Sequence, residues 1–144
     1  MLTAYATAQY QEMQVQTTPG RLVVMLYDGA LRFLHLALDA QGKGDYLTQG
    51  INLGKAQDIV LHLNNTLDMS VGGVAPQLRS LYNYLMERLL VANAENRADY
   101  IEEAIRLLQP LRDAWEHAER SVQAESAREL ERRLSGPSLL AVAA

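Results

Sequence analysis

The sequence predicts an all-α fold, an antiparallel four-helix bundle with an additional short N-terminal helix or lid segment. Aromatic residues make up only 6% of the 144 residues, and Leu, Ala, Gln, Glu and Arg dominate, so the residues that strands favour are scarce. Apolar residues also recur at helical spacing through four long segments. Hydrophobic residues account for 49% of the chain, which is enough for one domain to bury a core.

The first long helix is expected to run from Pro19 to Gln41. The hydroxyl of Thr18 can accept a hydrogen bond from a free amide at the helix start, and Pro19 has no amide to leave unpaired. Gly42 is expected to cap the other end. The polar residues of this helix fall on one narrow stripe: Asp28, Arg32, His35 and Asp39. The remaining surface is apolar and is much wider than the apolar face of an ordinary bundle helix.

This surplus of apolar surface has two interpretations, which periodicity alone does not separate. The helix can be central and contact all the others, or the bundle can leave a groove between helices that takes up an apolar peptide. Gly29, Gly50 and Gly54 lie inside predicted helices, where each costs about 1 kcal/mol relative to Ala. They indicate either the close approach of another backbone or a sequence that is not optimised.

Two further helices are predicted in the middle of the chain. Asp45 is expected to cap the second helix, which ends near Met69. The Ser-Val-Gly-Gly sequence at 70–73 then interrupts the pattern. Pro76 is expected to open the third helix, which ends near Ala94.

The fourth helix is predicted to begin with a capping box formed by Asp99 and Glu102. Pro110 lies inside it and lacks the amide that would bond to Arg106, so we expect a kink there. After Arg120 the composition changes to Ser, Glu, Ala and Arg, with few apolar residues. We expect this part to be a frayed, mobile helix.

Composition excludes several classes of function. The chain has no cysteine, which excludes a disulfide scaffold and a thiol nucleophile and is compatible with a cytoplasmic location. Its net charge of −4 argues against nucleic-acid binding. The longest apolar run, residues 22–38, contains three polar residues, so no membrane insertion is expected. The first basic residue is Arg21, so no secretory signal is expected.

Neither a metal nor another cofactor is expected. A di-iron helical bundle needs Glu three positions before His, and none of the three histidines has it: the pairs are Arg32–His35, Ile59–His62 and Ala114–His117. No catalytic constellation or phosphate loop is present, so the chain is not expected to be an enzyme. The alternative function is a four-helix histidine phosphotransfer domain with His35 as phosphoacceptor. However, Leu-Ala-Leu-Asp follows His35, in place of the usual Lys and Gly.

Several motifs, in unbroken order, resemble the flagellar secretion chaperone family FliS. The main ones are MLYDGA at 25–30, KAQDI at 55–59 and LRDAW at 111–115, and the resemblance spans about residues 5–118. It implies a cytoplasmic bundle that binds the disordered C-terminal region of flagellin. It further implies that this chaperone prevents premature polymerisation and delivers flagellin to the flagellar type III export apparatus, without catalysis.

The resemblance also implies which residues form the flagellin-binding groove: Leu22, Met25, Leu26, Tyr27 and Phe33 in the first long helix, and Lys55, Ala56, Ile59 and Leu63 in the second. Leu26 and Phe33 can equally belong to the core, and Trp115 is expected there. Replacing Tyr27 or Ile59 by Asp is expected to weaken flagellin binding without unfolding the helices. The family's N-terminal segment can cover part of the groove, which here implies a lid containing Tyr5, Tyr10 and Met13.

The resulting division is an N-terminal lid segment at 1–17, a helical bundle chaperone domain at 18–120 and a mobile C-terminal extension at 121–144. Besides flagellin, the resemblance implies an export gate component and flagellin regulators as partners. A monomer or weak homodimer is expected, because the apolar residues 139–142 could occupy the groove of a neighbouring chain.

Overall fold

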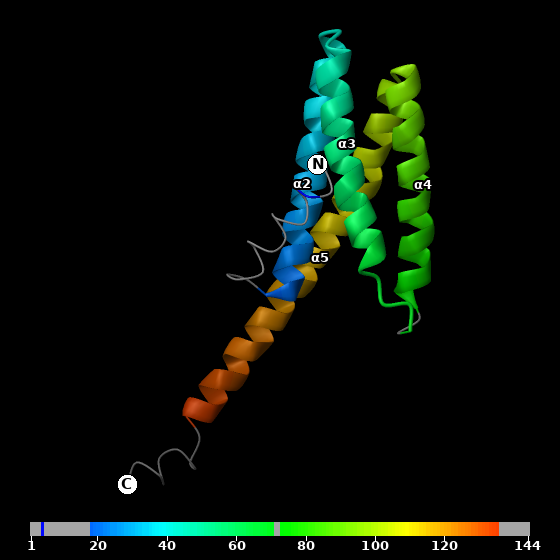
Figure 1. Cartoon of the computed structure of the whole chain (residues 1–144). Coiled ribbons are helices and arrows are strands. Elements are labelled where there is room, and N and C mark those ends of the chain that lie inside the picture. The colour runs from blue at the N-terminus through cyan, green and yellow to red at the C-terminus, as the bar shows by residue number, and fades with distance from the viewer. Residues whose placement is uncertain (1–3, 5–17, 71–72, 136–144) are drawn as a thin grey trace.

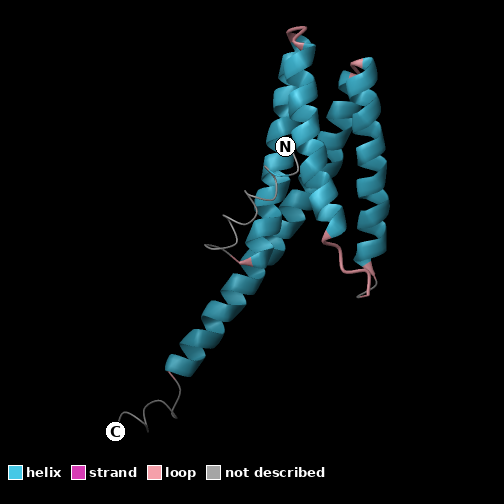
Figure 2. Cartoon of the chain, in the orientation of Figure 1, coloured by secondary structure: helices cyan, strands magenta, loops and turns pink. Residues whose placement is uncertain are grey.

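The computed structural model describes residues 4, 18–70 and 73–135. Within these ranges the chain forms helices joined by loops, with no strand (Figure 2), and the all-α prediction is confirmed. The helices are α2 (Pro19–Gly42), α3 (Tyr46–Asn65), α4 (Val74–Glu95) and α5 (Ala98–Leu134). The predicted lid residues Tyr5, Tyr10 and Met13 lie outside the described part of the chain.

The four helices alternate in direction along the bundle (Figure 1). Helix α2 packs along α3 and α5, and α4 packs on α3 and α5. Ten of the 24 residues of α2 are buried, more than in any other helix. Its wide apolar surface is therefore explained largely by a central position. None of the helices in the described ranges is long and apolar enough to span a bilayer.

Both predicted caps on the α2–α3 hairpin are present. The Arg21 amide donates to the Thr18 hydroxyl at 3.2 Å, and the Thr48 amide donates to the Asp45 carboxylate at 3.1 Å. The glycine at the turn was predicted incorrectly, because Gly42 still belongs to α2. Gly44 adopts the left-handed conformation with φ +72°, which glycine tolerates best.

The loop between α3 and α4 is longer than predicted. Helix α3 ends at Asn65, before the expected Met69, and α4 begins at Val74, two residues before Pro76. Gly73, with φ +63°, turns the chain into α4. The third position of a helix has no intrahelical amide bond to lose, so Pro76 fits there without opening the helix.

The predicted capping box at the start of α5 is wrong. Arg97 is the N-terminal cap and its side chain makes no cap bond, while Asp99, in the first turn, pairs with the Arg97 guanidinium at 2.7 Å. Helix α5 then continues through Pro110 to Leu134 without a break. Residues 121–134 of the predicted extension are thus helical and largely exposed.

Candidate functional site

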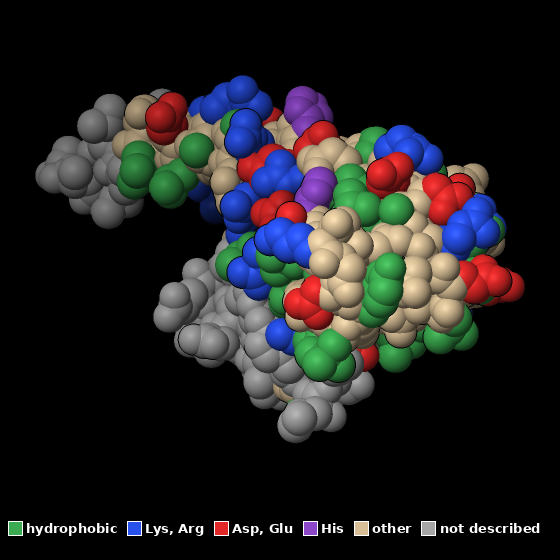
Figure 3. Space-filling model, turned by 90° about the horizontal axis from the view of Figure 1, so that it is seen from above, with side chains coloured by type: hydrophobic (Ala, Val, Ile, Leu, Met, Phe, Trp, Pro, Cys, Tyr) green, Lys and Arg blue, Asp and Glu red, His purple; other side chains and the backbone are tan. Residues whose placement is uncertain are grey.

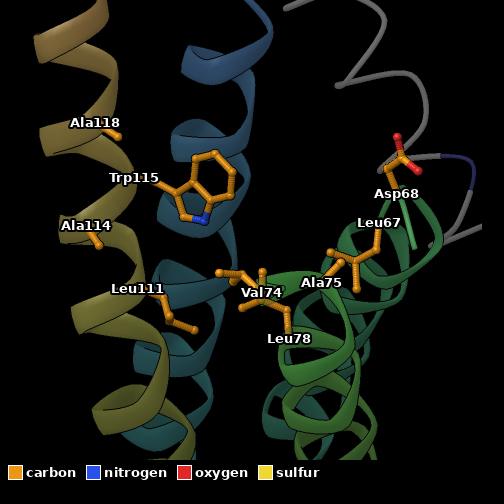
Figure 4. A pocket seen from close by; sticks show the side chains of 9 residues that line it. All are labelled: Leu67, Asp68, Val74, Ala75, Leu78, Leu111, Ala114, Trp115 and Ala118. Carbon is orange, nitrogen blue, oxygen red and sulfur yellow. The ribbon is translucent and has the colours of Figure 1, made fainter. Parts of the chain in front are cut away.

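An apolar pocket of about 570 Å³ opens where α4 begins, between α4, the loop that joins α3 to α4 and the middle of α5. Figure 4 shows Leu111 and Trp115 on one side and Val74 and Leu78 on the other. Asp68 is the one polar residue among those that line it: Leu67, Asp68, Val74, Ala75, Leu78, Leu111, Ala114, Trp115 and Ala118. This surface suits apolar side chains.

The pocket exists because α4 and α5 meet at one end and separate at the other (Figure 1). At the meeting end, Asn96 adopts a left-handed conformation that ends α4. Arg88 then donates to Glu103 at 3.1 Å and lies over the Tyr100 ring at 3.9 Å, so polar contacts hold this end together. At the other end the two helices diverge, and the first turns of α4 line the wedge-shaped space between them.

Large apolar side chains at the mouth of the wedge are exposed to solvent. Val74 is 63% exposed, and Met69, in the preceding loop, is 40% exposed. On the α5 side, Val122 is 62% exposed and follows the pocket residue Ala118 by one helical turn. An apolar pocket with an exposed apolar side chain such as Val74 in its lining is typical of a site where another protein docks.

Helix α5 is fixed against the first turn of α2 by the buried carboxylate of Glu119. The Thr18 hydroxyl donates to Glu119 Oε1 at 2.5 Å. A Cβ atom at Gly20 would lie 2.1 Å from Glu119 Oε2, so the missing side chain of Gly20 makes room for the carboxylate. The carboxylate lies at a helix N-terminus, where the macrodipole favours negative charge.

Two ion pairs extend this attachment along both helices. Arg21 contacts Glu116 at 2.6 Å, and Arg112 contacts Asp28 at 2.7 Å. Since Trp115 lies between Arg112 and Glu116, these contacts fix the backbone that carries one wall of the pocket.

Two buried tyrosines lie behind that wall. The hydroxyl groups of Tyr27 in α2 and Tyr82 in α4 form a hydrogen bond. Burial raises the pKa of both tyrosines above the usual value, so both stay protonated. This hydrogen bond connects α2 with α4 in the interior of the bundle.

Beyond Glu119, α5 projects from the bundle as an arm. Figure 3, which views the molecule from above, shows charged side chains of both signs along the arm and where it leaves the bundle. Glu129 pairs with Arg132 at 2.5 Å and with Arg133 at 3.2 Å, and Glu125 pairs with Arg128 at 3.0 Å. Such pairs one turn apart stabilise a helix that lacks tertiary contacts.

The structure places the predicted groove residues differently from the pocket residues. Seven of the nine are buried in the bundle: Leu22, Leu26, Tyr27, Phe33, Ala56, Ile59 and Leu63. Met25 and Lys55 are partly exposed, and Lys55 lies over the Phe33 ring at 5.3 Å. None of the nine lines the pocket between α4 and α5. Burial of Tyr27 and Ile59 means that an aspartate at either position would disturb the fold.

Two of the interior glycines make close approaches. A Cβ at Gly29 would lie 3.2 Å from Ile59 Cδ1, and one at Gly50 would lie 3.2 Å from Asn93 Oδ1. Gly29 thus lets α2 approach α3, and Gly50 lets α3 approach α4. The atoms that come close belong to side chains, so neither glycine shows the close approach of another backbone.

Sequence reasoning missed most of the pocket. Trp115 is expected in the core, yet Leu111 and Trp115 are both only half-buried. Leu67 and Val74 flank the break at 70–73. Large apolar residues on both sides of a loop were the available signal that this end of the bundle is unusual.

The structure offers no support for the chemical alternatives. His35 is exposed on α2. Within 18–70 and 73–135, no three His, Asp or Glu side chains come together as a metal would need.

Comparison with known proteins identifies the family. The family model described as flagellar protein FliS matches residues 1–122. The flagellar secretion chaperone FliS of Bacillus subtilis is 37% identical over 110 residues, covering 76% of this chain and 82% of that protein. The FliS of Salmonella typhimurium is 37% identical over 116 residues, covering 79% and 86%. FliSB of Pseudomonas aeruginosa is 32% identical over 122 residues, covering 81% and 97%.

The family-model match ends at residue 122, within α5 and just past Glu119, where the arm begins. FliS proteins are chaperones and not enzymes, which also removes the phosphotransfer alternative. A secretion chaperone of the flagellum has a flagellar protein as its partner. The chain belongs to the FliS family of flagellar secretion chaperones.

Proposed function

We propose that this chaperone binds the disordered C-terminal region of flagellin in the cytoplasm, prevents its premature polymerisation and delivers it to the flagellar type III export apparatus. The observation that carries the proposal is the open apolar pocket between α4 and α5. An amphipathic helix that places its apolar face in such a groove hides the surface that would otherwise drive assembly.

Binding carries an entropic cost for the partner. A disordered segment loses conformational entropy as it folds on a surface, so a large contact area is needed to offset the loss. The pocket offers apolar surface for this contact, because its lining is apolar apart from Asp68 and includes the exposed Val74.

The groove residues carried over from the family remain part of the proposal. Met25 and Lys55 are accessible at the surface of α2 and α3. The seven buried residues, such as Tyr27 at 0% exposure, become accessible to flagellin only if the part of the chain that covers them moves. An export gate component and flagellin regulators are proposed as further partners, and the chaperone is proposed to be a monomer or weak homodimer.

The test compares two matched substitutions in α4. Val74 lies at the pocket and Leu90 lies outside it, and each side chain is 63% exposed. Val74→Glu places a carboxylate at the apolar mouth and is expected to weaken binding of a C-terminal flagellin segment at least about tenfold by calorimetry. Leu90→Glu is expected to change binding less than about twofold. Circular dichroism checks that both variants remain helical.

Equal affinities of the wild type and Val74→Glu would show that the pocket does not bind flagellin. No binding of the segment by the wild-type chaperone would reject the proposed function itself.

A further inference from the structure

We propose that Asp68 orients the helix that docks in the pocket, by pairing with a Lys or Arg side chain at the edge of that helix's apolar face. The inference rests on the proposed function, which makes the pocket a binding site for flagellin. It adds a specificity-determining residue and states the charge that the bound segment carries beside its apolar side chains.

Asp68 is the only charged residue among the described residues that line the pocket. The other lining side chains belong to Leu, Val, Ala and Trp, and the attraction between apolar surfaces has no preferred direction. Apolar contacts alone would therefore let a helix lie in the pocket in either direction. Figure 4 shows the Asp68 carboxylate at the edge of the pocket, on the side opposite Trp115. A negative charge on one edge makes the two directions unequal in energy.

Ser70 holds the Asp68 carboxylate in place. The backbone amide of Ser70 donates to Asp68 Oδ1 at 3.1 Å, and the Ser70 hydroxyl donates to the same oxygen at 2.5 Å. The hydrogen bonds from the hydroxyl and the amide lower the pKa of Asp68, so the group is charged at neutral pH. A carboxylate that is already held loses little side-chain entropy when it forms an ion pair, and this loss is one reason why exposed pairs usually contribute little.

The second oxygen of the carboxylate is open to a ligand. Asp68 is exposed, both Ser70 bonds end on Oδ1, and none of the described residues donates a hydrogen bond to Oδ2. An ionised carboxylate can only accept hydrogen bonds, so the group that pairs with it must be a donor. Lys and Arg donate with a positive charge, and their long apolar stems can cover Leu67 and Val74 while the charged end stays in water. These two residue types therefore fit this edge of the pocket.

The experiment removes the charge of Asp68 and keeps its shape. The amide oxygen in Asp68→Asn can still accept from Ser70, so the loop keeps its hydrogen bonds. Asp39→Asn is the matched control, because Asp39 is an exposed carboxylate that pairs with Lys43 near the end of α2, away from the pocket (Figure 1). Binding of a C-terminal flagellin segment is measured by calorimetry in low and in high sodium chloride, about 0.1 M and about 1 M, between which the Debye length falls from about 10 Å to about 3 Å. Thermal melts check that each variant keeps the stability of the wild type.

Asp68→Asn is expected to weaken binding about twofold to fivefold in low salt, which is the range for one exposed ion pair. In high salt the affinities of Asp68→Asn and the wild type are expected to converge, because salt screens an exposed pair. Asp39→Asn should match the wild type in both solutions. Each Lys and Arg of the segment is then replaced by Gln in turn, and one of these changes should weaken binding to the wild type but not to Asp68→Asn.

Equal affinities of the wild type and Asp68→Asn in low salt would overturn the inference and leave the proposed function intact. A loss that persists in high salt, or that Asp39→Asn shares, would also overturn it, because neither result comes from an ion pair at the pocket. If Asp68→Asn changed only the self-association of the chaperone in light scattering, the edge of the pocket would bind a second copy of the chain and the inference would be wrong. No binding of the segment by the wild type would reject the proposed function and the inference with it.

Discussion

The contact between Gly20 and Glu119 gives a sharp test of how α5 is attached to α2. In Gly20→Ala, the new Cβ would lie 2.1 Å from Glu119 Oε2, so the carboxylate must leave its place and lose the Thr18 hydroxyl at 2.5 Å. A hydrogen bond to a charged group contributes about 1.5–3 kcal/mol. Alanine in a helix gains up to about 1 kcal/mol over glycine. The net expectation is a loss of about 0.5–2 kcal/mol in the free energy of unfolding and a fall in Tm of about 2–8 °C.

The control repeats the change without the carboxylate. In a Glu119→Ala background the obstruction is gone, so Gly20→Ala is expected to stabilise the protein by roughly 0.5–1 kcal/mol. Urea unfolding followed by circular dichroism gives the four free energies of this double-mutant cycle. The reasoning is refuted if Gly20→Ala has the same effect in both backgrounds, because the reversal of sign comes only from the contact with Glu119.

Three further predictions concern the core, pH and the arm. Ile59→Asp places an unpaired carboxylate at a side chain that is 3% exposed, and it is expected to reduce stability by at least about 3 kcal/mol in thermal melts; intact stability would show that Ile59 is accessible. The Arg88 guanidinium lowers the pKa of Glu103. The pair therefore stabilises the fold fully at a pH above about 4.3, the pKa of an ordinary glutamate. This stabilisation is lost as the pH falls through the lowered pKa of Glu103. Melts between neutral and acidic pH should therefore show a weaker acid dependence in Glu103→Gln, and an identical profile would contradict this assignment. A chain that ends at Arg120 is expected to keep the melting temperature of the bundle. Light scattering is expected to show that any weak dimer is lost. Dimers that persist in this shortened chain would show that residues 121–144 are not needed for self-association.

Local signals in the sequence were sufficient for the helices and for two of their caps. Thr18 and Asp45 act as predicted because a cap depends on residues within one turn of it. Asp99 failed as a cap because Arg97, two residues before it, binds its carboxylate.

The pocket and the carboxylate contact could not be predicted in the same way. Thr18 and Glu119 are 101 positions apart, and nothing in the pattern of either helix indicates that they meet. The pocket results from the divergence of α4 from α5, which is a property of their packing. Family resemblance indicated residues in two helices but could not distinguish a buried side chain from an accessible one, as Tyr27 shows.

The projecting end of α5 has a consequence for the motion of the protein in solution. Glu119 meets the first turn of α2, and none of the other described helices packs on α5 beyond it, so α5 extends about 20 Å past these helices at 1.5 Å per residue. A particle with such a protrusion experiences more friction than a sphere of equal mass and rotates more slowly end over end than about its long axis. Sedimentation should therefore give a raised frictional ratio, and nitrogen-15 relaxation should distinguish amide vectors parallel to α5 from those across it.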